Sequence, residues 1–394
     1  MEAPTVIRTM KNIYSLLFDE QAPDEKAPDE KAPDKQAPDE HEAVEEQSSD
    51  RLRPGEAIVR YLRERSPEFR RISEIRQQGW DNPEGDAYFK KQRRNADRGD
   101  AQTASYFYSL MIKIGEELHR TADAFAIRRR GPSDPGGRAS ILDMCMAPGG
   151  FLATALSENP GAEALAFSLP ASAGGHRVLL PRSSAVERRF LDVTMLAADM
   201  GAGEIPRDHP DSGNFVPRQL EPGKLFDLVL CDGQVLRTHA RASYRESREA
   251  RRLTTAQLAL GLEHLRPGGT MVVLLHKPEA WDTANLLRDF CRFSSVRLVK
   301  PTRGHANRSS FYMIAADVRS RHPRAVEAVR GWKAIWKAAT LGSDDEYKQA
   351  AYPGGAGADE LLEAFGSELV SLGTEIWKIQ ADALEKSSFI QRKR

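Results

Sequence analysis

The sequence predicts an α/β protein with a mostly parallel sheet, and two features of residues 138–318 carry that prediction. Seven short apolar runs alternate there with stretches of helical periodicity. The runs are apolar throughout rather than at every second residue, which is typical of strands buried on both faces. A single sheet covered by helices on both faces explains both the alternation of strands with helices and the apolar character of the strands. The expected strands are 139–145, 163–169, 189–194, 226–232, 269–276, 296–301 and 310–318, and the expected helices among them are 151–158, 254–265 and 280–293.

Helical segments are expected on both sides of this core, which divides the chain into four parts. Residues 1–50 hold 14 acidic and 5 basic side chains and an Ala-Pro-Asp unit repeated four times. They have almost nothing apolar to bury and are expected to form a disordered acidic tail. A basic, helical, substrate-side segment follows at 51–130 and includes an amphipathic helix over 104–125. The core domain is 131–320, and a C-terminal helical extension that packs on it is 321–394.

Cysteine content and hydropathy exclude several classes of protein. Cys145, Cys231 and Cys291 are too few and too scattered for a disulfide framework or a zinc site. No apolar run approaches the roughly 20 residues of a membrane-spanning helix, and the acidic N-terminal region lacks the apolar segment of a signal peptide. We therefore expect a soluble intracellular protein, in the nucleus or the cytoplasm.

The turn after the first expected strand is the first candidate functional element. Residues 143–151, Asp-Met-Cys-Met-Ala-Pro-Gly-Gly-Phe, lead from an apolar strand into a helix. Gly149 and Gly150 lack a Cβ atom and allow a tight turn and the close approach of a ligand. The positive end of the following helix favours an anionic group. This is neither the dinucleotide fingerprint nor a P-loop, and on its own the turn is equally consistent with plain strand-to-helix geometry.

Later strands bring polar residues to the same edge of the sheet. Asp192, Asp232 and Lys277 each stand at the end of an expected strand, and 298–315 is a basic, hydroxyl-rich loop followed by a strand. In an open α/β sheet, ligands bind outside the carboxyl ends of the strands, near the point where the strand order reverses. A single strand-end aspartate often only caps a helix. The ordered series together favours a functional site.

In this series the chain resembles the FtsJ/RrmJ-like family of S-adenosylmethionine-dependent RNA ribose 2′-O-methyltransferases. The first motif of the family, Asp-Leu-x-x-Ala-Pro-Gly-Gly-Phe, is similar to 143–151, and "DVT" and "DLVLCDG" resemble its third and fourth motifs. The strand "LRPGGTMVVLLHK" is similar to the one that bears the catalytic lysine, and "KPTRGHANRSSFY" resembles the segment after it. The resemblance covers about residues 85–318. It implies a Rossmann-like class I methyltransferase fold with a seven-stranded sheet.

The resemblance also implies a site for S-adenosyl-L-methionine, without a metal. Asp192 is implied to accept a hydrogen bond from the adenine amino group. Ser168 stands where the family usually has an acid for the ribose hydroxyls, a departure that should weaken cofactor binding. The other residues implied to bind the cofactor are Asp143, Pro148, Gly149, Gly150, Phe151 and Asp232.

Asp232 and Lys277 match two members of the family's catalytic Lys-Asp-Lys-Glu tetrad. A ribose 2′-hydroxyl is a poor nucleophile at neutral pH, and a desolvated lysine can accept its proton or stabilise the alkoxide. Asp232 would orient that lysine by opposite charge. The other two members depart from the pattern, because Ser310 stands where the family has glutamate and the first lysine is missing. The positions at or near that lysine are Tyr108 and Ser109, and the weak substitutes are Lys113, Lys90 and Lys91.

RNA contacts are expected from basic stretches of the chain. Residues 234–252 contain six arginines that are suited to binding phosphates, with Tyr244 to stack on a base. The alternative is a solvated helix with internal Glu–Arg pairs. The basic stretch 90–98 is open to the same two interpretations. The residues assigned to RNA binding are Arg237, Arg241, Tyr244, Lys300, Arg303 and Arg308.

Three functions follow from the resemblance and its departures. The leading one is methyl transfer from S-adenosylmethionine to a ribose 2′-hydroxyl of RNA. The second is a degenerate relative that binds cofactor or RNA with little catalysis, motivated by Ser310 and the missing first lysine. The third is methylation of a small molecule or a protein, since a fold does not determine its substrate.

Overall fold

The computed structural model describes residues 53–80, 82, 101–128, 138–236, 239–351 and 357–391. The expected acidic tail, the basic stretch 90–98 with Lys90 and Lys91, and Arg237 all lie outside the described residues. Within the described part, none of the helices is long and apolar enough to cross a membrane.

The core is one seven-stranded sheet with the strand order β3-β2-β1-β4-β5-β7-β6. Its first five members pair in parallel, while β7 is antiparallel to both β5 and β6. The expectation of a mostly parallel sheet is therefore confirmed. The strands are β1 Ser140–Asp143, β2 Glu163–Ser168, β3 Val186–Phe190, β4 Phe226–Cys231, β5 Leu265–His276, β6 Ser295–Val299 and β7 Ser310–Val318.

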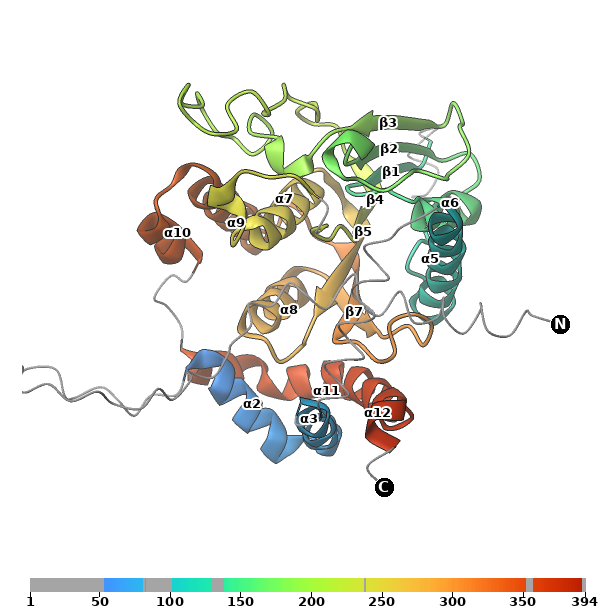
Figure 1. The fold of residues 1–394 in the computed structure, drawn as a ribbon, viewed down its shortest axis with the longest axis vertical. Coiled ribbons are helices and arrows are strands. Elements are labelled where there is room, and N and C mark those ends of the chain that lie inside the picture. The colour runs from blue at the N-terminus through green and yellow to red at the C-terminus, as the bar shows by residue number, and fades with distance from the viewer. Residues whose placement is uncertain are drawn as a thin grey trace, which may run out of the picture.

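Helices cover both faces of the sheet, which explains why the strands are apolar throughout. Leu228 and Leu230 of β4 pack into the cluster that contains α5 (Ala101–Ala122) and α6 (Gly150–Glu158). The intervening Val229 and Cys231 pack into the opposite cluster. The helices on that second face are α7 Glu249–Glu263, α8 Trp281–Phe293 and α9 Pro323–Leu341 (Figure 1).

Most of the strand boundaries differ from the expected ones, and two of the differences have a clear physical cause. The third strand ends at Phe190, because Asp192 accepts a hydrogen bond from the backbone N–H of Thr194 and begins the short 3-10 helix η3, Val193–Met195. The fifth strand starts at Leu265 rather than Gly269. It runs through the Pro-Gly-Gly turn with an irregularity in its pairing to β4.

The two ends of the described chain meet in a separate helical layer. Helices α2 (Pro54–Arg65) and α3 (Pro67–Trp80) pack against α11 (Ala358–Glu385), and α12 (Ser388–Gln391) packs against α3. This terminal layer lies together at the lower end of Figure 1, next to α8. By contrast, α5 packs on α6 and β6, so it belongs with the sheet although it precedes it in sequence.

The C-terminal extension splits between two places. Helix α9 packs along α7, with α10 (Asp344–Ala351) beside it, while α11 lies in the terminal layer. The apolar stripe of α11 is used in packing, since Leu361, Phe365, Leu369 and Ile376 are all buried.

Candidate functional site

A cavity opens at the carboxyl ends of β1, β2 and β4, the edge where the polar strand ends were expected to gather. The space there, counted together with the open solvent at its mouth, is about 950 Å³. Strand β1 is the switch point, because the chain proceeds from it to β2 on one side and β4 lies on the other. Of the residues expected to bind a cofactor, the cavity wall contains Pro148, Ser168, Asp192 and Asp232.

The Pro-Gly-Gly turn forms part of this wall, but its members have different tasks. Gly149 has φ +109°, a conformation that favours glycine, and the carbonyl of Pro148 accepts hydrogen bonds from the N–H groups of Leu179 and Leu180. A Cβ atom on Gly150 would lie 2.5 Å from Cβ of Met111 and 2.7 Å from the carbonyl oxygen of Tyr108. Gly150 therefore allows α6 to pack closely on α5, a role that differs from the expected approach of a ligand.

Phe151 belongs to the core and not to the cavity. It is buried, and its ring packs edge-on against Tyr312 of β7 with centroids 5.5 Å apart and beside Phe125 at 6.3 Å. Its side chain thus fills the space between α6 and the sheet. We accordingly do not propose a cofactor contact for Phe151.

Ser168 is the polar group that most directly marks the cavity as a binding site. Its side chain is 1% exposed and lines the cavity. Among the described residues, no group forms a hydrogen bond with its buried hydroxyl oxygen. A buried hydroxyl without a partner costs free energy, and a ligand hydroxyl would satisfy it. Ser168 thus fits the ribose end of a nucleoside, the position at which the family usually has an acid.

Two carboxyl groups stand side by side at the ends of β1 and β4. Asp143 is buried, and burial followed by the charge of Asp232 raises the pKa of Asp143 well above its usual value, although the N–H of Cys145 opposes the rise. Burial likewise raises the pKa of the half-buried Asp232 to about 7. Near neutral pH the pair therefore resists carrying two negative charges, and a cationic ligand group beside it would favour full ionisation.

This pair predicts a stability profile that differs from that of an ordinary aspartate. Between about pH 4 and pH 7 folded Asp232 holds a proton that the unfolded chain has lost, so the free energy of unfolding falls as pH rises and levels off above pH 7. In Asp232→Asn this slope is expected to be smaller. The free energy of unfolding of the variant at pH 8 is expected to exceed that of the wild type by roughly 2 kcal/mol. Urea titrations at pH 5, 6, 7 and 8 measure both. Parallel profiles for the two proteins would contradict the assignment.

Asp192 follows β3 and lines the cavity, and its carboxylate is already engaged. One oxygen accepts hydrogen bonds from the N–H and hydroxyl of Thr194, at 2.9 and 2.8 Å. The other lies 3.4 Å from Nε2 of His239 and 3.3 Å from the guanidinium of Arg245. Burial would raise the pKa of Asp192, but His239 and Thr194 lower it below its usual value. An adenine amino group would have to share this carboxylate with the side chains of His239 and Arg245.

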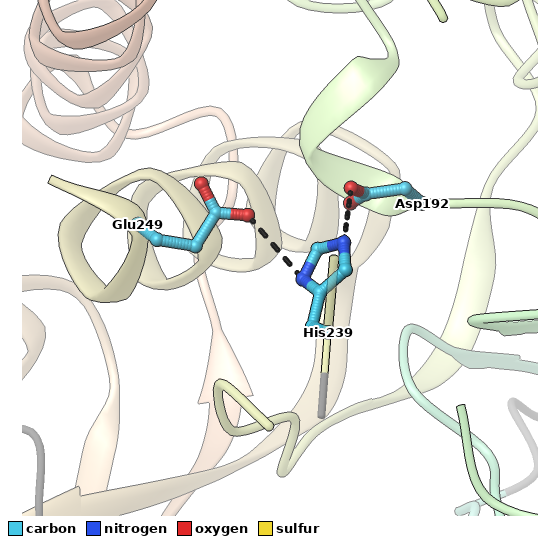
Figure 2. Close-up of side chains that lie close together, drawn as sticks. All are labelled: Asp192, His239 and Glu249. Atoms are coloured by element: carbon cyan, nitrogen blue, oxygen red, sulfur yellow. Dashed lines mark ion pairs between the residues drawn. The ribbon is translucent and has the colours of Figure 1, made fainter. Parts of the chain in front are cut away.

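His239 bridges Asp192 to Glu249 on α7. Figure 2 shows the imidazole between the two carboxylates, with Nδ1 at 3.7 Å from Glu249 and Nε2 toward Asp192. Although these three residues could in principle hold a metal ion, the carboxylates face different ring nitrogens, and the guanidinium of Arg245 already contacts both of them. The arrangement is that of an ion-pair network.

Lys277 is not among the residues that line the cavity. It follows β5, and the pairing of Cys231 with Val273 places it three residues, roughly 10 Å, farther along the strands than Asp232. His276 connects the two strand ends, since its Nε2 lies 3.3 Å from the side-chain oxygen of Gln234, which lines the cavity. The backbone of Lys277 has φ +44°, a left-handed conformation that non-glycine residues rarely adopt and that is often found at functional sites.

Ser310 lies beside this strand end but is occupied. It pairs with His276 across β5 and β7, and its buried hydroxyl lies 2.7 Å from Nδ1 of His305. Burial, aided by the charges of Arg308 and Lys300, holds the pKa of His305 well below its usual value. Ser310 and a neutral His305 therefore form a structural hydrogen bond at the position where the family has a glutamate.

Lys113 is a poor substitute for the missing first lysine. Phe107 and Met111 are the residues of α5 that line the cavity. Helical geometry places Lys113 on the opposite side of the helix from them, and its side chain is exposed. We do not propose a catalytic role for it.

The arginine-rich segment has two interpretations, an RNA surface or a solvated helix with internal Glu–Arg pairs. Its described part contains internal Glu–Arg pairs, but Arg245 and Arg252 form them in the protein interior rather than in solvent. Arg245 and Arg252 are buried among carboxylates. Arg248 donates hydrogen bonds to the carbonyl of Gly342, which follows α9, and to Asp344, the first residue of α10. Arg251 is paired with Asp282 of α8. These side chains connect α7 to its neighbouring helices. Helices α9 and α10 cover a face of α7 that, from the sequence alone, would be exposed to solvent.

Most of the other residues assigned to RNA are engaged within the protein. Tyr244 donates a hydrogen bond to Asp211 at 2.8 Å, and Arg241 forms an ion pair with Glu246 at 3.0 Å. Lys300 is buried and donates to the backbone carbonyls of Arg308 and Ser310, and Arg308 is itself 1% exposed. Arg303 is exposed and remains available for RNA.

Sequence reasoning missed His239, Glu249, Gln234 and His276. The first two lie within or next to a stretch dominated by arginines, and their relation to Asp192 depends on contacts across about fifty residues. His276 directly precedes Lys277, and its position at a strand end was the one available signal.

The strand order with its antiparallel β7, together with a cavity at the carboxyl ends, defines a class I methyltransferase. The family model described as FtsJ-like methyltransferase matches residues 118–318, about half of the chain, and the chain belongs to that family. Its cofactor is S-adenosyl-L-methionine. No curated protein matches the chain when sequences are compared.

Solved structures with a similar fold include methyltransferases of several kinds. A ribosomal RNA methyltransferase from Plasmodium falciparum is 14% identical, with 52% of this chain and 97% of that chain covered and a TM-score of 0.32. An rRNA methylase from Streptococcus thermophilus is 10% identical, with 51% and 96% covered and a TM-score of 0.28. The N-methyltransferase NodS from Bradyrhizobium japonicum is 14% identical, with 52% and 96% covered and a TM-score of 0.31. Likeness at this level says nothing about substrate.

Proposed function

We propose that this methyltransferase transfers a methyl group to a ribose 2′-hydroxyl of RNA, with Lys277 and Asp232 at the catalytic centre. The observation that carries the proposal is the joining of two strand ends. Asp232 in the cavity wall and Lys277 follow the neighbouring strands β4 and β5, which pair in parallel, and the contact between His276 and Gln234 links the two strand ends.

The residues present fit S-adenosylmethionine, which supplies a methyl group activated by a sulfonium. The orphaned hydroxyl of Ser168 suits a ribose hydroxyl, and the carboxyl pair of Asp143 and Asp232 suits a positive charge. Asp192 and the apolar side chains of Leu191 and Leu253 would hold the adenine end. Pro148, which lines the cavity, would supply a close backbone surface.

Lys277 would supply the base or the electrostatic stabilisation for the nucleophile. Removing the proton from a ribose hydroxyl develops negative charge on the oxygen, and a nearby ammonium or amine group lowers the cost of that charge. Asp232 would hold the lysine by opposite charge once ionised. The exposed Arg303, on the loop that follows β6, would contact a phosphate of the RNA.

A second candidate is a family member that binds the cofactor with little turnover. The observation favouring it is the Ser310–His305 hydrogen bond at 2.7 Å, which leaves no carboxylate at the position of the family's glutamate. Methylation of a small molecule or a protein is the third candidate, and the substrate assay below separates all three.

Transfer of a labelled methyl group distinguishes these candidates. The purified protein is incubated with methyl-tritiated S-adenosylmethionine and, in parallel, with total RNA, total protein or a small-metabolite extract. We expect label in the RNA fraction, and we expect calorimetry to register binding of S-adenosylhomocysteine. Binding without label transfer would support the second candidate, and label confined to protein or metabolites the third.

A further inference from the structure

We propose that the terminal helical layer positions the catalytic strand end, through a clamp that Arg76, Trp377 and Gln380 form on Glu279. Glu279 lies two residues after Lys277, in the turn that leads from β5 to α8. Arg76 belongs to α3, and the other two belong to α11. The proposal rests on the proposed function of Lys277, and its members other than Glu279 lie outside the residues that match the family.

Two helices, α3 and α11, converge on the carboxylate of Glu279. Arg76 donates from one guanidinium nitrogen to Glu279 Oε1 at 2.5 Å and from the other to the side-chain oxygen of Gln380 at 2.8 Å. The indole N–H of Trp377 donates to Glu279 Oε2 at 3.2 Å. Both carboxylate oxygens of Glu279 are therefore held, one from each terminal helix.

The clamp is buried, so its polar groups depend on one another. Trp377 is fully buried, Gln380 is 4% exposed, and Glu279 is 6% exposed. Burial alone would raise the pKa of Glu279, but the charge of Arg76 and the hydrogen bonds that it receives lower the pKa below its usual value. An ionised carboxylate with so little water around it needs these partners, which ties the position of the turn to the terminal layer.

The turn that contains Glu279 also determines the backbone conformation of Lys277. The carbonyl of Lys277 accepts a hydrogen bond from the N–H of Ala280 at 2.9 Å, and its N–H donates to Ser309 at 3.1 Å. Its left-handed φ of +44° persists only where surrounding contacts hold it. The side-chain amide of Gln380 also reaches the carbonyl of Asn307, at 3.5 Å, so α11 contacts both loops that bracket the catalytic strand end.

A second contact between α3 and α11 provides a matched control. Arg71 pairs with Asp382 at 2.7 Å and with Glu385 at 2.7 Å, but it is 40% exposed and touches neither loop of the strand end. If the two helices served only to stabilise the fold, loss of Arg71 and loss of Arg76 would both lower stability and would differ only in the size of that effect. If the clamp positions Lys277, only the loss of Arg76 changes the reaction.

The experiment compares Arg76→Met, Arg76→Lys and Trp377→Phe with Arg71→Met in the full chain. We expect Arg76→Met to lower kcat for RNA methylation about 30-fold, as displaced catalytic groups do, with the Kd for S-adenosylhomocysteine unchanged within twofold. Arg76→Lys should recover part of the rate. Trp377→Phe keeps the aromatic packing, so its expected loss of about fivefold in kcat tests the clamp even if Arg76→Met does not fold.

Hydrogen exchange gives a readout that does not depend on catalysis. Peptides covering residues 277–280 are expected to exchange faster in Arg76→Met and Trp377→Phe than in Arg71→Met. Unchanged exchange there, or equal kcat in the Arg71 and Arg76 variants, would overturn the clamp. Wild type that transfers no methyl group to RNA while the exchange difference persists would overturn the proposed function and leave the clamp as a structural device.

Discussion

Replacing Lys277 by alanine is expected to reduce the rate of RNA methylation by about 10²- to 10⁴-fold, the range typical of losing a general base or a charge-stabilising group. Lys277 is not among the residues that line the cavity that would hold the cofactor. Binding of S-adenosylhomocysteine should therefore remain within about threefold of the wild type.

The measurement is the initial rate of tritium transfer at saturating cofactor, with calorimetry for the cofactor product. Lys337→Ala serves as the control, because Lys337 is an exposed lysine on α9, a helix that packs along α7 rather than at the end of β5. Its rate should equal that of the wild type. Equal incorporation by Lys277→Ala and Lys337→Ala would remove Lys277 from the mechanism.

Arg252→Met is expected to cause the largest loss of stability, roughly 2–4 kcal/mol in the free energy of unfolding. Arg252 is fully buried on α7 and pairs with Glu249 at 2.6 Å. It also donates to the hydroxyl of Thr340 on α9 at 2.9 Å and to the carbonyl of Thr194 at 3.2 Å. Removing one partner from a buried ion pair leaves the other charge poorly compensated, and Arg245 and His239 offset only part of this.

Urea denaturation of Arg252→Met and of Arg251→Met measures this effect. Arg251 is the neighbouring residue on the same helix, but its partner Asp282 is exposed, so its loss should cost less than about 1 kcal/mol. Because Thr194 follows Asp192, Arg252→Met should also weaken binding of the cofactor product. Equal midpoints for the two variants would mean that the buried network contributes little to stability.

The fold was predictable from the sequence because its signals are local. Each strand of a doubly covered sheet is an apolar run, and each cofactor-side turn follows its strand directly, as at Asp143–Gly150. The boundaries at β3 and β5 were missed because a side-chain hydrogen bond, Asp192 to Thr194, and a strand irregularity determine them. Neither the hydrogen bond nor the irregularity changes the hydropathy pattern of the sequence.

The site was predictable only in part, because burial and pairing depend on distant residues. Asp192 and Asp232 were placed at the cavity by their positions at strand ends, and Ser168 by the resemblance to the family. The basic character of Arg245, Arg248 and Arg252 suggested RNA, but carboxylates and carbonyls from elsewhere in the chain engage them. Likewise, Gly150 and Phe151 adjoin the cavity turn in sequence but pack in the core.

The position of the transferred methyl group tests the central claim most directly. RNA labelled by the wild-type protein is hydrolysed in alkali, which requires the free 2′-oxygen of each nucleotide to attack the adjacent phosphodiester. A 2′-O-methylated nucleotide blocks its own cleavage, so we expect the tritium to be recovered in alkali-resistant dinucleotides, and to be absent when Lys277→Ala is used. Tritium recovered in mononucleotides would show methylation of a base and would contradict the account.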